Sequence, residues 1–170
     1  MRIRQATLED IGAVMELVRR VVPLMRASGN LQWDEDYPNA EVFERDVSLD
    51  QLWLVEIDGQ AAGVAAITTD QEPEYANVGW DIHELSIVVH RLAVDTVFRG
   101  KGVAAALMEQ AEAVARNREI AVLRVDTNKQ NQATQKLFPK LGYTLSGETG
   151  FGFRPGLRFL CYEKRLASFR

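Results

Sequence analysis

The segment Arg99–Ala104 has the residue types and the spacing of an anion-binding turn. It reads Arg99-Gly100-Lys101-Gly102-Val103-Ala104 and lies between a short apolar stretch, Leu92-Ala93-Val94, and a helix-forming run. Glycine allows the backbone to come close to a ligand, and the first N–H groups of a helix have no partner within that helix. Their aligned dipoles add a partial positive charge. The sequence therefore predicts an anion site, and phosphate fits it best.

The identity of the phosphate ligand depends on the surrounding elements. Gly100-x-Gly102-x-x-Ala105 fits the loose dinucleotide pattern G-x-G-x-x-A. That pattern has an acidic residue roughly 20 positions further on, and Asp126 lies at about that distance. The chain after Asp126 is too short for the remaining strands of a dinucleotide-binding sheet, and the nucleoside-triphosphate motif G-x-x-x-x-G-K-S/T is absent. The alternative is a helix that begins after a glycine turn and binds no ligand.

Hydrophobic periodicity indicates a mixed α/β protein with a largely antiparallel sheet. The expected strands are residues 2–6, 52–57, 62–68, 84–94, 120–125, 143–147 and 157–164. The first expected helix follows Thr7 as its N-cap and ends at Ser28-Gly29-Asn30, with Pro23 kinking or dividing it. The other expected helices cover residues 40–47, 102–116 and 131–141, and Pro139 interrupts or ends the last of them. Asp58-Gly59 between apolar runs predicts a hairpin turn.

Composition limits the class of protein. A chain of 170 residues with a net charge of −4 suits one domain with its own core and provides no basic field for nucleic acid. Cys161 is the single cysteine, so no internal disulfide is expected, and its apolar neighbours suggest a buried strand position. No apolar run approaches the ~18 residues of a membrane span, and no signal-peptide core opens the chain. We expect a cytoplasmic protein, monomeric or homodimeric, without nucleic-acid, membrane or metal partners.

Two motifs together resemble the GNAT N-acetyltransferase superfamily. Arg99-x-x-Gly102-x-Ala104 is similar to its acetyl-CoA loop, R/Q-x-x-G-x-G/A, and Leu92-Ala93-Val94 is similar to the strand before that loop. The second motif, N-x-x-A-x-x-L/F-Y-x-x-x-G-F, has its counterparts in Asn131, Leu137-Phe138 and Gly142-Tyr143. The resemblance, closest to a bacterial branch, covers most of the chain and is strongest over about residues 86–145.

The resemblance implies one GNAT-like acetyltransferase domain over residues 1–170. Its fold is α/β (α+β), a mixed, largely antiparallel sheet flanked by helices and splayed between the fourth and fifth strands. It also implies acetyl-CoA as co-substrate. The pyrophosphate would lie on the N–H groups of Arg99–Ala104, with Arg99 and Lys101 adding charge or remaining solvated. The pantetheine arm would pair with the backbone of Leu92–Val94 like a short extra strand.

Two further residues have both a ligand role and a structural one. By resemblance, Asn131 would hydrogen-bond the pantetheine arm or the adenosine end, and a helix N-cap is its structural alternative. Phe138 would pack against the arm. At the position of Phe138, many relatives have a tyrosine, and that tyrosine protonates the leaving thiolate. Phe138 donates no proton, so either Tyr143 or another group takes that role, or no acid is needed. The last alternative is open because a thiol is a modest leaving group that can depart as a thiolate.

Attack on a thioester needs a neutral amine, so a general base assists at neutral pH. Val88 stands where some relatives have a glutamate, and it has no basic atom. His90 lies two residues on and so faces the same side of the strand, with a pKa suited to the task or a purely structural role. Glu84 on the same face, acting through water, and Asp126, at the end of the neighbouring strand, are the other candidates. A backbone N–H near Val94 would stabilise the oxyanion.

The acceptor is expected near an acidic and aromatic loop. The loop contains Trp33, Glu35 and Tyr37, and Trp80 is expected to join them, with Glu72, Glu74 and Tyr75 as further contributors. Carboxylates and aromatic rings suit a cationic amine through charge pairing and cation–π contact. The alternative is a solvated acidic loop with Trp33 in the core. Three residues of a late glycine-rich turn would close over the site or serve a dimer contact: Phe151, Phe153 and Arg154.

These inferences predict an acyl-CoA-dependent N-acetyltransferase. The enzyme would transfer an acetyl group from acetyl-CoA to a primary amine of a small cationic molecule by direct attack in a ternary complex. Two alternatives stay open. One is a protein or peptide N-acetyltransferase, and the other is a CoA-binding module with little catalysis.

Overall fold

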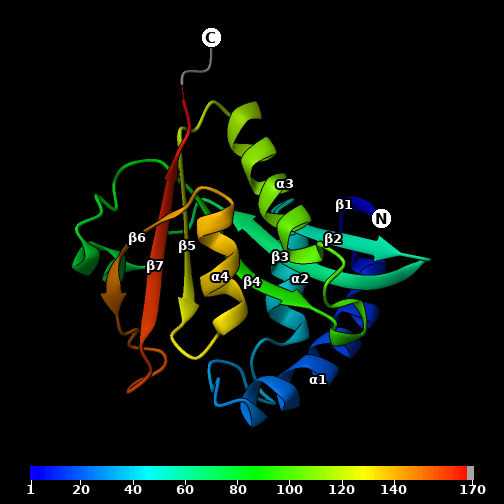
Figure 1. Cartoon of the computed structure of the whole chain (residues 1–170). Coiled ribbons are helices and arrows are strands. Elements are labelled where there is room, and N and C mark those ends of the chain that lie inside the picture. Colours follow the sequence, from blue (N-terminus) through cyan, green and yellow to red (C-terminus); the bar gives the residue numbers. More distant parts are fainter. Residues whose placement is uncertain (168–170) are drawn as a thin grey trace. The chain divides into compact units, whose positions relative to one another are not determined.

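A computed structural model describes residues 1–167 (Figure 1). Its strands are β1 Arg2–Gln5, β2 Leu52–Ile57, β3 Gln60–Thr68, β4 Ile87–Val94, β5 Val122–Asn128, β6 Thr144–Thr149 and β7 Phe159–Arg165. Its helices are α1 Ile11–Ala27, α2 Ala40–Ser48, α3 Val103–Asn117 and α4 Gln132–Lys140, with short 3-10 turns at Leu8–Asp10, Pro73–Val78 and Thr96–Phe98. This order of elements is the one the sequence predicts.

The strands are ordered β1-β2-β3-β4-β5-β7-β6 in one seven-stranded sheet, in which β4 and β5 form the parallel pair. The predicted mixed α/β fold with a largely antiparallel sheet is therefore confirmed. The parallel ladder joins Ile87–Val89 to Leu123–Val125, whereas β4 continues to Val94 and β5 continues to Asn128. The ladder thus ends before either strand does, as the predicted splay requires.

The chain divides into two compact units. The first contains Met1–Ile67 and His90–Gln110, and its core lies between α1, α2, β2 and β3. The apolar residues of α1 recur at helical spacing, and this spacing places them on the buried side of the helix. The buried members of α1 are Ile11, Val14, Leu17, Val18, Val21 and Val22. The β2–β3 hairpin turns at Asp58 and Gly59, which have φ of 52° and 75°, the two positive values that a type I′ turn needs.

The second unit contains Thr68–Val89 and the described chain from Ala111 onward, with the antiparallel strands β5, β7 and β6 side by side. Side chains alternate between the two faces of β5. Thr127 faces α4, because its hydroxyl lies 2.6 Å from the hydroxyl of Thr134. Arg124 and Asp126 therefore face the opposite side, which the 3-10 turn Pro73–Val78 and neighbouring aromatic residues cover. The members of that aromatic cluster are Tyr75, Trp80, Val88, Phe151, Phe159 and Cys161.

Several predicted boundaries are wrong, and hydrogen bonds explain the differences. Glu84 lies before β4, because its N–H donates to the carbonyl of Asp81 and its own carbonyl accepts from the side chain of Gln71. Ile120 closes the end of α3 by donating to the carbonyl of Ala115, so β5 begins later and includes Asp126 within it instead of ending there. The remaining differences are shifts of a few residues at strand ends.

The prolines are tolerated inside helices. Pro23 lies within α1, which continues unbroken to Ala27, and Pro139 lies within α4, which continues to Lys140. The first helix is therefore not divided. Cys161 is fully buried in β7, as predicted.

Within residues 1–167, no helix is long and apolar enough to cross a membrane. The same described residues contain no cluster of three or more histidine, cysteine or acidic side chains arranged to hold a metal ion.

Candidate active site

The turn that leads into α3 is fixed from its first residue. Asp95 is buried, and its Oδ1 accepts from the N–H of Val97 at 3.1 Å and caps the 3-10 turn Thr96–Phe98. Its Oδ2 lies 2.8 Å from a guanidinium nitrogen of Arg20 on α1. The N–H of Asp95 donates to the carbonyl of Ala62 on β3. Asp95 therefore ties the start of the turn to α1 and β3, a role that the sequence analysis missed.

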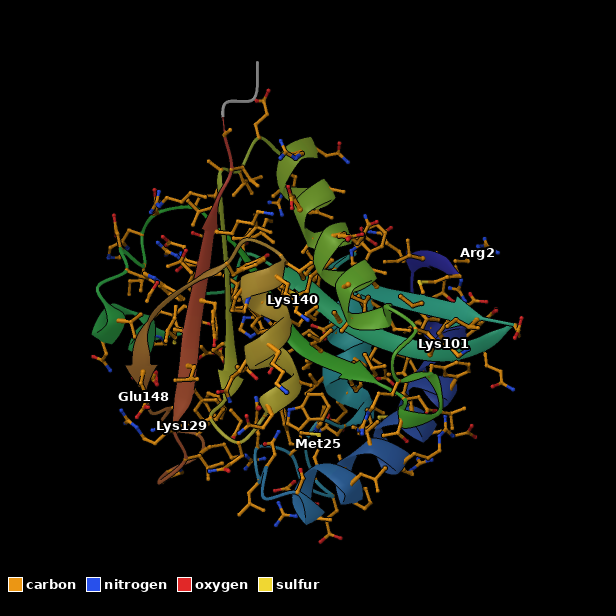
Figure 2. The ribbon with its side chains drawn as sticks, in the orientation of Figure 1. Arg2, Met25, Lys101, Lys129, Lys140 and Glu148 are labelled. Atoms are coloured by element: carbon orange, nitrogen blue, oxygen red, sulfur yellow. The ribbon has the colours of Figure 1, made fainter. Side chains whose placement is uncertain are left out.

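The two glycines of the turn have left-handed backbones, with φ of 79° at Gly100 and 76° at Gly102. A Cβ built on either glycine meets no heavy atom within 4 Å, so the protein leaves the space beside both open. The carbonyl of Gly102 accepts from the N–H of Ala106 at 3.0 Å, which makes Gly102 the N-cap of α3, without a capping side chain. The N–H groups of the first turn are thus left for a ligand. Arg99 and Lys101 are exposed, and Figure 2 labels Lys101 in this turn.

A third glycine sets how closely α3 approaches the sheet. A Cβ on Gly63 of β3 would lie 2.4 Å from Cγ1 of Val103 and 3.2 Å from the carbonyl oxygen of Ala93. Gly63 therefore allows the first turn of α3 to rest against β3 beside β4. Val103 and Ala93 are themselves buried, while Leu92 and Val94 are half-buried.

The strand β4 turns at Arg91, immediately before Leu92–Val94. Arg91 has a φ of 54°, a left-handed backbone that is unusual for a residue with a side chain. Its Nε donates to Oδ2 of Asp46 at 2.7 Å, and one terminal nitrogen donates to Oδ1 at 2.6 Å. The other terminal nitrogen lies 3.4 Å from the hydroxyl of Tyr37. Asp46 is 1% exposed, so a buried bidentate ion pair holds this bend.

His90 precedes that bend and is half-buried. His90 stands two positions after Val88 in β4, and its position on the same side of the strand stays a prediction from alternation. Val88 belongs to the aromatic cluster of the second unit, whose other members include Tyr75 and Trp80.

The carboxylate of Asp126 is paired with a buried tyrosine. The hydroxyl of Tyr75, which is fully buried, donates to Oδ2 of Asp126 at 2.5 Å. Burial raises the pKa of Asp126 to about 6, the hydrogen bond from Tyr75 opposes this change, and the charge of Glu72 adds to it. A carboxylate that titrates near neutral pH is suited to general base catalysis. The sequence indicated Asp126, but no pattern indicated its pairing with Tyr75.

Glu84 has a different environment. Its carboxylate lies 2.7 Å from a guanidinium nitrogen of Arg165 and 3.2 Å from one of Arg124. The hydrogen bond from Arg165 lowers the pKa of Glu84. The expectation that Glu84 shares a strand face with His90 is wrong, because Glu84 lies outside β4. Ion pairing also makes this carboxylate a weaker base.

Arg124 is the largest fully buried side chain of the described chain. Its Nε donates to Glu163 at 2.9 Å, one terminal nitrogen donates to Gln71 at 2.6 Å and to the carbonyl of Asp81 at 2.9 Å, and its guanidinium lies 5.0 Å from the ring centre of Trp80. Arg124 therefore fixes the loop before β4 against β5. Its role was not predicted from the sequence, where an arginine in an otherwise apolar strand is the only signal for it.

The residues of the second motif pack on the α4 side of the sheet. Phe138 is 1% exposed, with ring-centre distances of 6.0 Å to Tyr143 and 5.4 Å to Tyr162. The hydroxyl of Tyr143 is buried and has no hydrogen-bond partner within the described residues. Burial raises the pKa of Tyr143 above its ordinary value. Asn131 caps α4, since its Oδ1 accepts from the N–H of Thr134 at 3.2 Å, which is the structural role considered for it.

The acceptor residues predicted from the sequence fall in different environments. Trp33 is 4% exposed and belongs to the core of the first unit, so the alternative that it packs in the core is confirmed. Glu35 is exposed and Tyr37 half-buried. Trp80 is buried, and its indole nitrogen donates to the hydroxyl of Ser146. The ring of Phe151 stacks on that of Phe153, which is 52% exposed.

Comparisons with known proteins agree with this geometry. The model of the Acetyltransferase (GNAT) family matches residues 18–143, more than half of the chain. The chain is 26% identical over 151 residues to the uncharacterised N-acetyltransferase YesJ of Bacillus subtilis, a match that covers 87% of this chain and 84% of that protein.

Two solved structures show the same fold. A GNAT-family acetyltransferase of Streptococcus agalactiae superposes with a TM-score of 0.82 at 28% identity, covering 98% of this chain and 96% of that one. The structure of yncA from Salmonella typhimurium, solved with its cofactor acetyl-CoA, has a TM-score of 0.72 at 19% identity and covers 99% of this chain and 95% of that one. With the matching family model, these likenesses identify the chain as a member of the GNAT acetyltransferase family.

Proposed function

We propose that this protein transfers an acetyl group from acetyl-CoA to the primary amine of a small cationic molecule, by direct attack in a ternary complex. The observation that supports this proposal best is the turn at Gly100 and Gly102. Both glycines are left-handed, both have open space where a Cβ would lie, and both lie in the turn that leads into α3. A helix start of this kind suits a pyrophosphate.

The donor would bind through the backbone. The N–H groups of Gly102, Val103 and Ala104 would hold the pyrophosphate, because those of Arg99 and Lys101 donate to the carbonyls of Thr96 and Phe98 within the turn. The half-buried backbone of Leu92–Val94 would pair with the amides of the pantetheine arm. The ion pair of Arg91 with Asp46 would fix the direction of that strand segment. Asn131 and Phe138 already have structural roles, as the N-cap of α4 and as a buried ring. Their contact with acetyl-CoA would be an additional role, and it is part of the proposal.

The chemistry needs three groups. A base takes a proton from the acceptor ammonium, and His90 and Asp126 are the two side chains best suited to it. A backbone N–H near Val94 would stabilise the oxyanion of the tetrahedral intermediate. The CoA sulfur departs as a thiolate, since a thiol of ordinary pKa leaves readily. Tyr143, the tyrosine considered as acid, has a buried hydroxyl with a raised pKa, and this favours departure without a protein acid.

A cationic acceptor is supported by the charges around Asp126. Glu72 raises the pKa of Asp126 through its own negative charge, so the two carboxylates act on one another. A protonated amine placed between them would relieve that repulsion. The cytoplasmic location and the monomeric or homodimeric state stay predictions from the sequence.

Calorimetry with acetyl-CoA, followed by thiol release with a panel of amines, tests the proposal. We expect binding at sub-millimolar ligand and turnover with small cationic amines. The absence of binding would overturn the proposal. Turnover with peptides alone would support a protein N-acetyltransferase instead, and tight binding without turnover would support a CoA-binding module.

A further inference from the structure

Tyr75 and Asp126 form a polar pair within an apolar surround. Tyr75 comes from the 3-10 turn Pro73–Val78, and Asp126 comes from β5. The ring of Tyr75 is held edge-on by Trp80, at 4.9 Å between ring centres, and by Phe151, at 6.0 Å. Such packing fixes the direction of the hydroxyl, and the hydroxyl meets Oδ2 of Asp126 at 2.5 Å. A short hydrogen bond to a carboxylate is stronger than one between neutral groups.

Asp126 also has a distinct position in β5, beyond its pairing with β4. Asp126 is the first residue of β5 beyond the parallel ladder, which ends at Val125. Its backbone pairs with Cys161 of β7 on the other edge. Arg124, two residues earlier on the same face, is engaged by Glu163 and Gln71. The arginine is therefore committed to other partners, and Asp126 is held by a neutral hydroxyl.

We propose that Tyr75 is a positioning residue that orients Asp126 as the proton acceptor for the amine in acetyl transfer. This inference rests on the proposed function. The hydroxyl of Tyr75 holds Oδ2, and Oδ1 takes the proton. Because Tyr75 is neutral, it orients the carboxylate without placing a positive charge beside it, whereas Arg165 lowers the pKa of Glu84.

The acceptor ammonium loses one proton to Oδ1 of Asp126, and its nitrogen then forms a bond to the carbonyl carbon of acetyl-CoA. The carbon–sulfur bond breaks, and the sulfur leaves with the bonding electron pair. The second amine proton goes to the thiolate through solvent, and Asp126 returns its proton to solvent. The products are the N-acetyl amine, CoA and one released proton.

Three groups face Asp126, two from the 3-10 turn and its N-cap and one from β7. Tyr75 donates its hydrogen bond, Glu72 precedes the same 3-10 turn and Cys161 lies opposite on β7. Burial and the charge of Asp126 raise the pKa of the Cys161 thiol to about 12, so the thiol stays neutral. The pKa of Tyr75 is also raised, first by burial, and its hydroxyl stays protonated as a donor. Near neutral pH, Asp126 is thus the member of the pair that titrates.

The test is the pH profile of kcat in two variants. Asp126→Asn should lower kcat by about 100-fold or more while acetyl-CoA affinity is retained. Tyr75→Phe keeps the ring and removes the donor, so the carboxylate becomes a stronger base. The acid limb of the profile should then move upward by about one pH unit, because a hydrogen bond to a charged group has that effect on its titration. The loss of rate should be larger at pH 6 than at pH 8.

Tyr162→Phe is the matched control. It removes the hydroxyl of a buried tyrosine on the α4 side of the same sheet, where Tyr162 packs on Phe138. Its acid limb should coincide with that of the unaltered protein. Acetyl-CoA affinity and thermal midpoints are measured for every variant, so loss of folding is recognised directly. Titration of the 13C-labelled carboxyl group of Asp126 should show the same upward shift of its midpoint in Tyr75→Phe, and this measurement does not depend on turnover.

The outcomes separate the two proposals. If the unaltered protein neither binds acetyl-CoA nor releases thiol, the proposed function fails and this inference fails with it. If the unaltered protein is active and Asp126→Asn retains kcat within threefold, the inference alone is overturned. An unmoved acid limb and carboxyl titration in Tyr75→Phe overturn the role of Tyr75.

Discussion

Replacing Gly102 by valine separates the use of the turn for a ligand from its use for folding. Gly102 has a φ of 76° and Gly29, directly after the C-cap of α1, has a φ of 92°. A Cβ on either meets no atom within 4 Å. Gly102→Val and Gly29→Val should therefore suffer the same backbone strain, about 1–2 kcal/mol for a left-handed residue. That strain lowers the thermal midpoint of a protein of this size by about 2–8 °C.

Acetyl-CoA should distinguish the two variants. At a concentration of about 100 times Kd, a ligand stabilises the folded state by about 2.7 kcal/mol. Gly29→Val should keep this stabilisation, because only its backbone is strained. In Gly102→Val the new side chain fills the space proposed for the pyrophosphate. A Kd raised by about 100-fold leaves only about 0.4 kcal/mol at the same concentration.

Differential scanning fluorimetry with and without acetyl-CoA measures both effects in one experiment, and calorimetry provides Kd. The reasoning about the turn is refuted if Gly102→Val binds acetyl-CoA within threefold of the unaltered protein. It is also refuted if Gly29→Val loses binding to the same degree, since the effect would then come from strain alone.

Three other results are expected. His90→Ala should lower kcat less than tenfold, and a 100-fold fall in steady-state assays would transfer the role of base from Asp126 to His90. Burial raises the pKa of Asp126 to about 6, so the folded protein favours the protonated carboxyl group. The free energy of unfolding therefore falls as the pH rises from about 4 to 6. Asp126→Asn should raise the thermal midpoint at pH 8 and leave it little changed at pH 4. Asp46→Asn leaves the guanidinium of Arg91 buried and should cost about 3–5 kcal/mol in urea unfolding. Arg158→Ala is the control, because the side chain of Arg158 is 51% exposed in its pair with Glu148, and it should leave the urea midpoint almost unchanged.

The sequence predicts the elements and the turn well, because both depend on local patterns. Helical spacing identifies α1, and the pair Asp58-Gly59 identifies the β2–β3 hairpin. The two glycines of the turn before α3 are recognisable because a left-handed backbone favours that one residue type.

Side-chain pairs between distant segments were not predictable in this way. Arg91 with Asp46, and Tyr75 with Asp126, are separated by 45 and 51 positions. No periodicity links such residues, since their contact depends on the order of strands and on where loops cross them. Glu84 shows the same limit, because two loop hydrogen bonds remove it from a strand whose pattern it continues.

The buried polar pairs of this chain differ in the charge that faces each carboxylate, and this difference supports the proposed role of Asp126. Around Arg124, the buried cation is matched by several acceptors, so the cluster holds the loop before β4 in place. Asp126 is instead matched by a neutral donor, which orients the carboxylate and leaves its burial uncompensated by charge. A protein selected for stability alone would place a cation or an apolar side chain there. Retaining an uncompensated carboxylate costs stability at neutral pH. This cost supports the proposed role of Asp126 as proton acceptor.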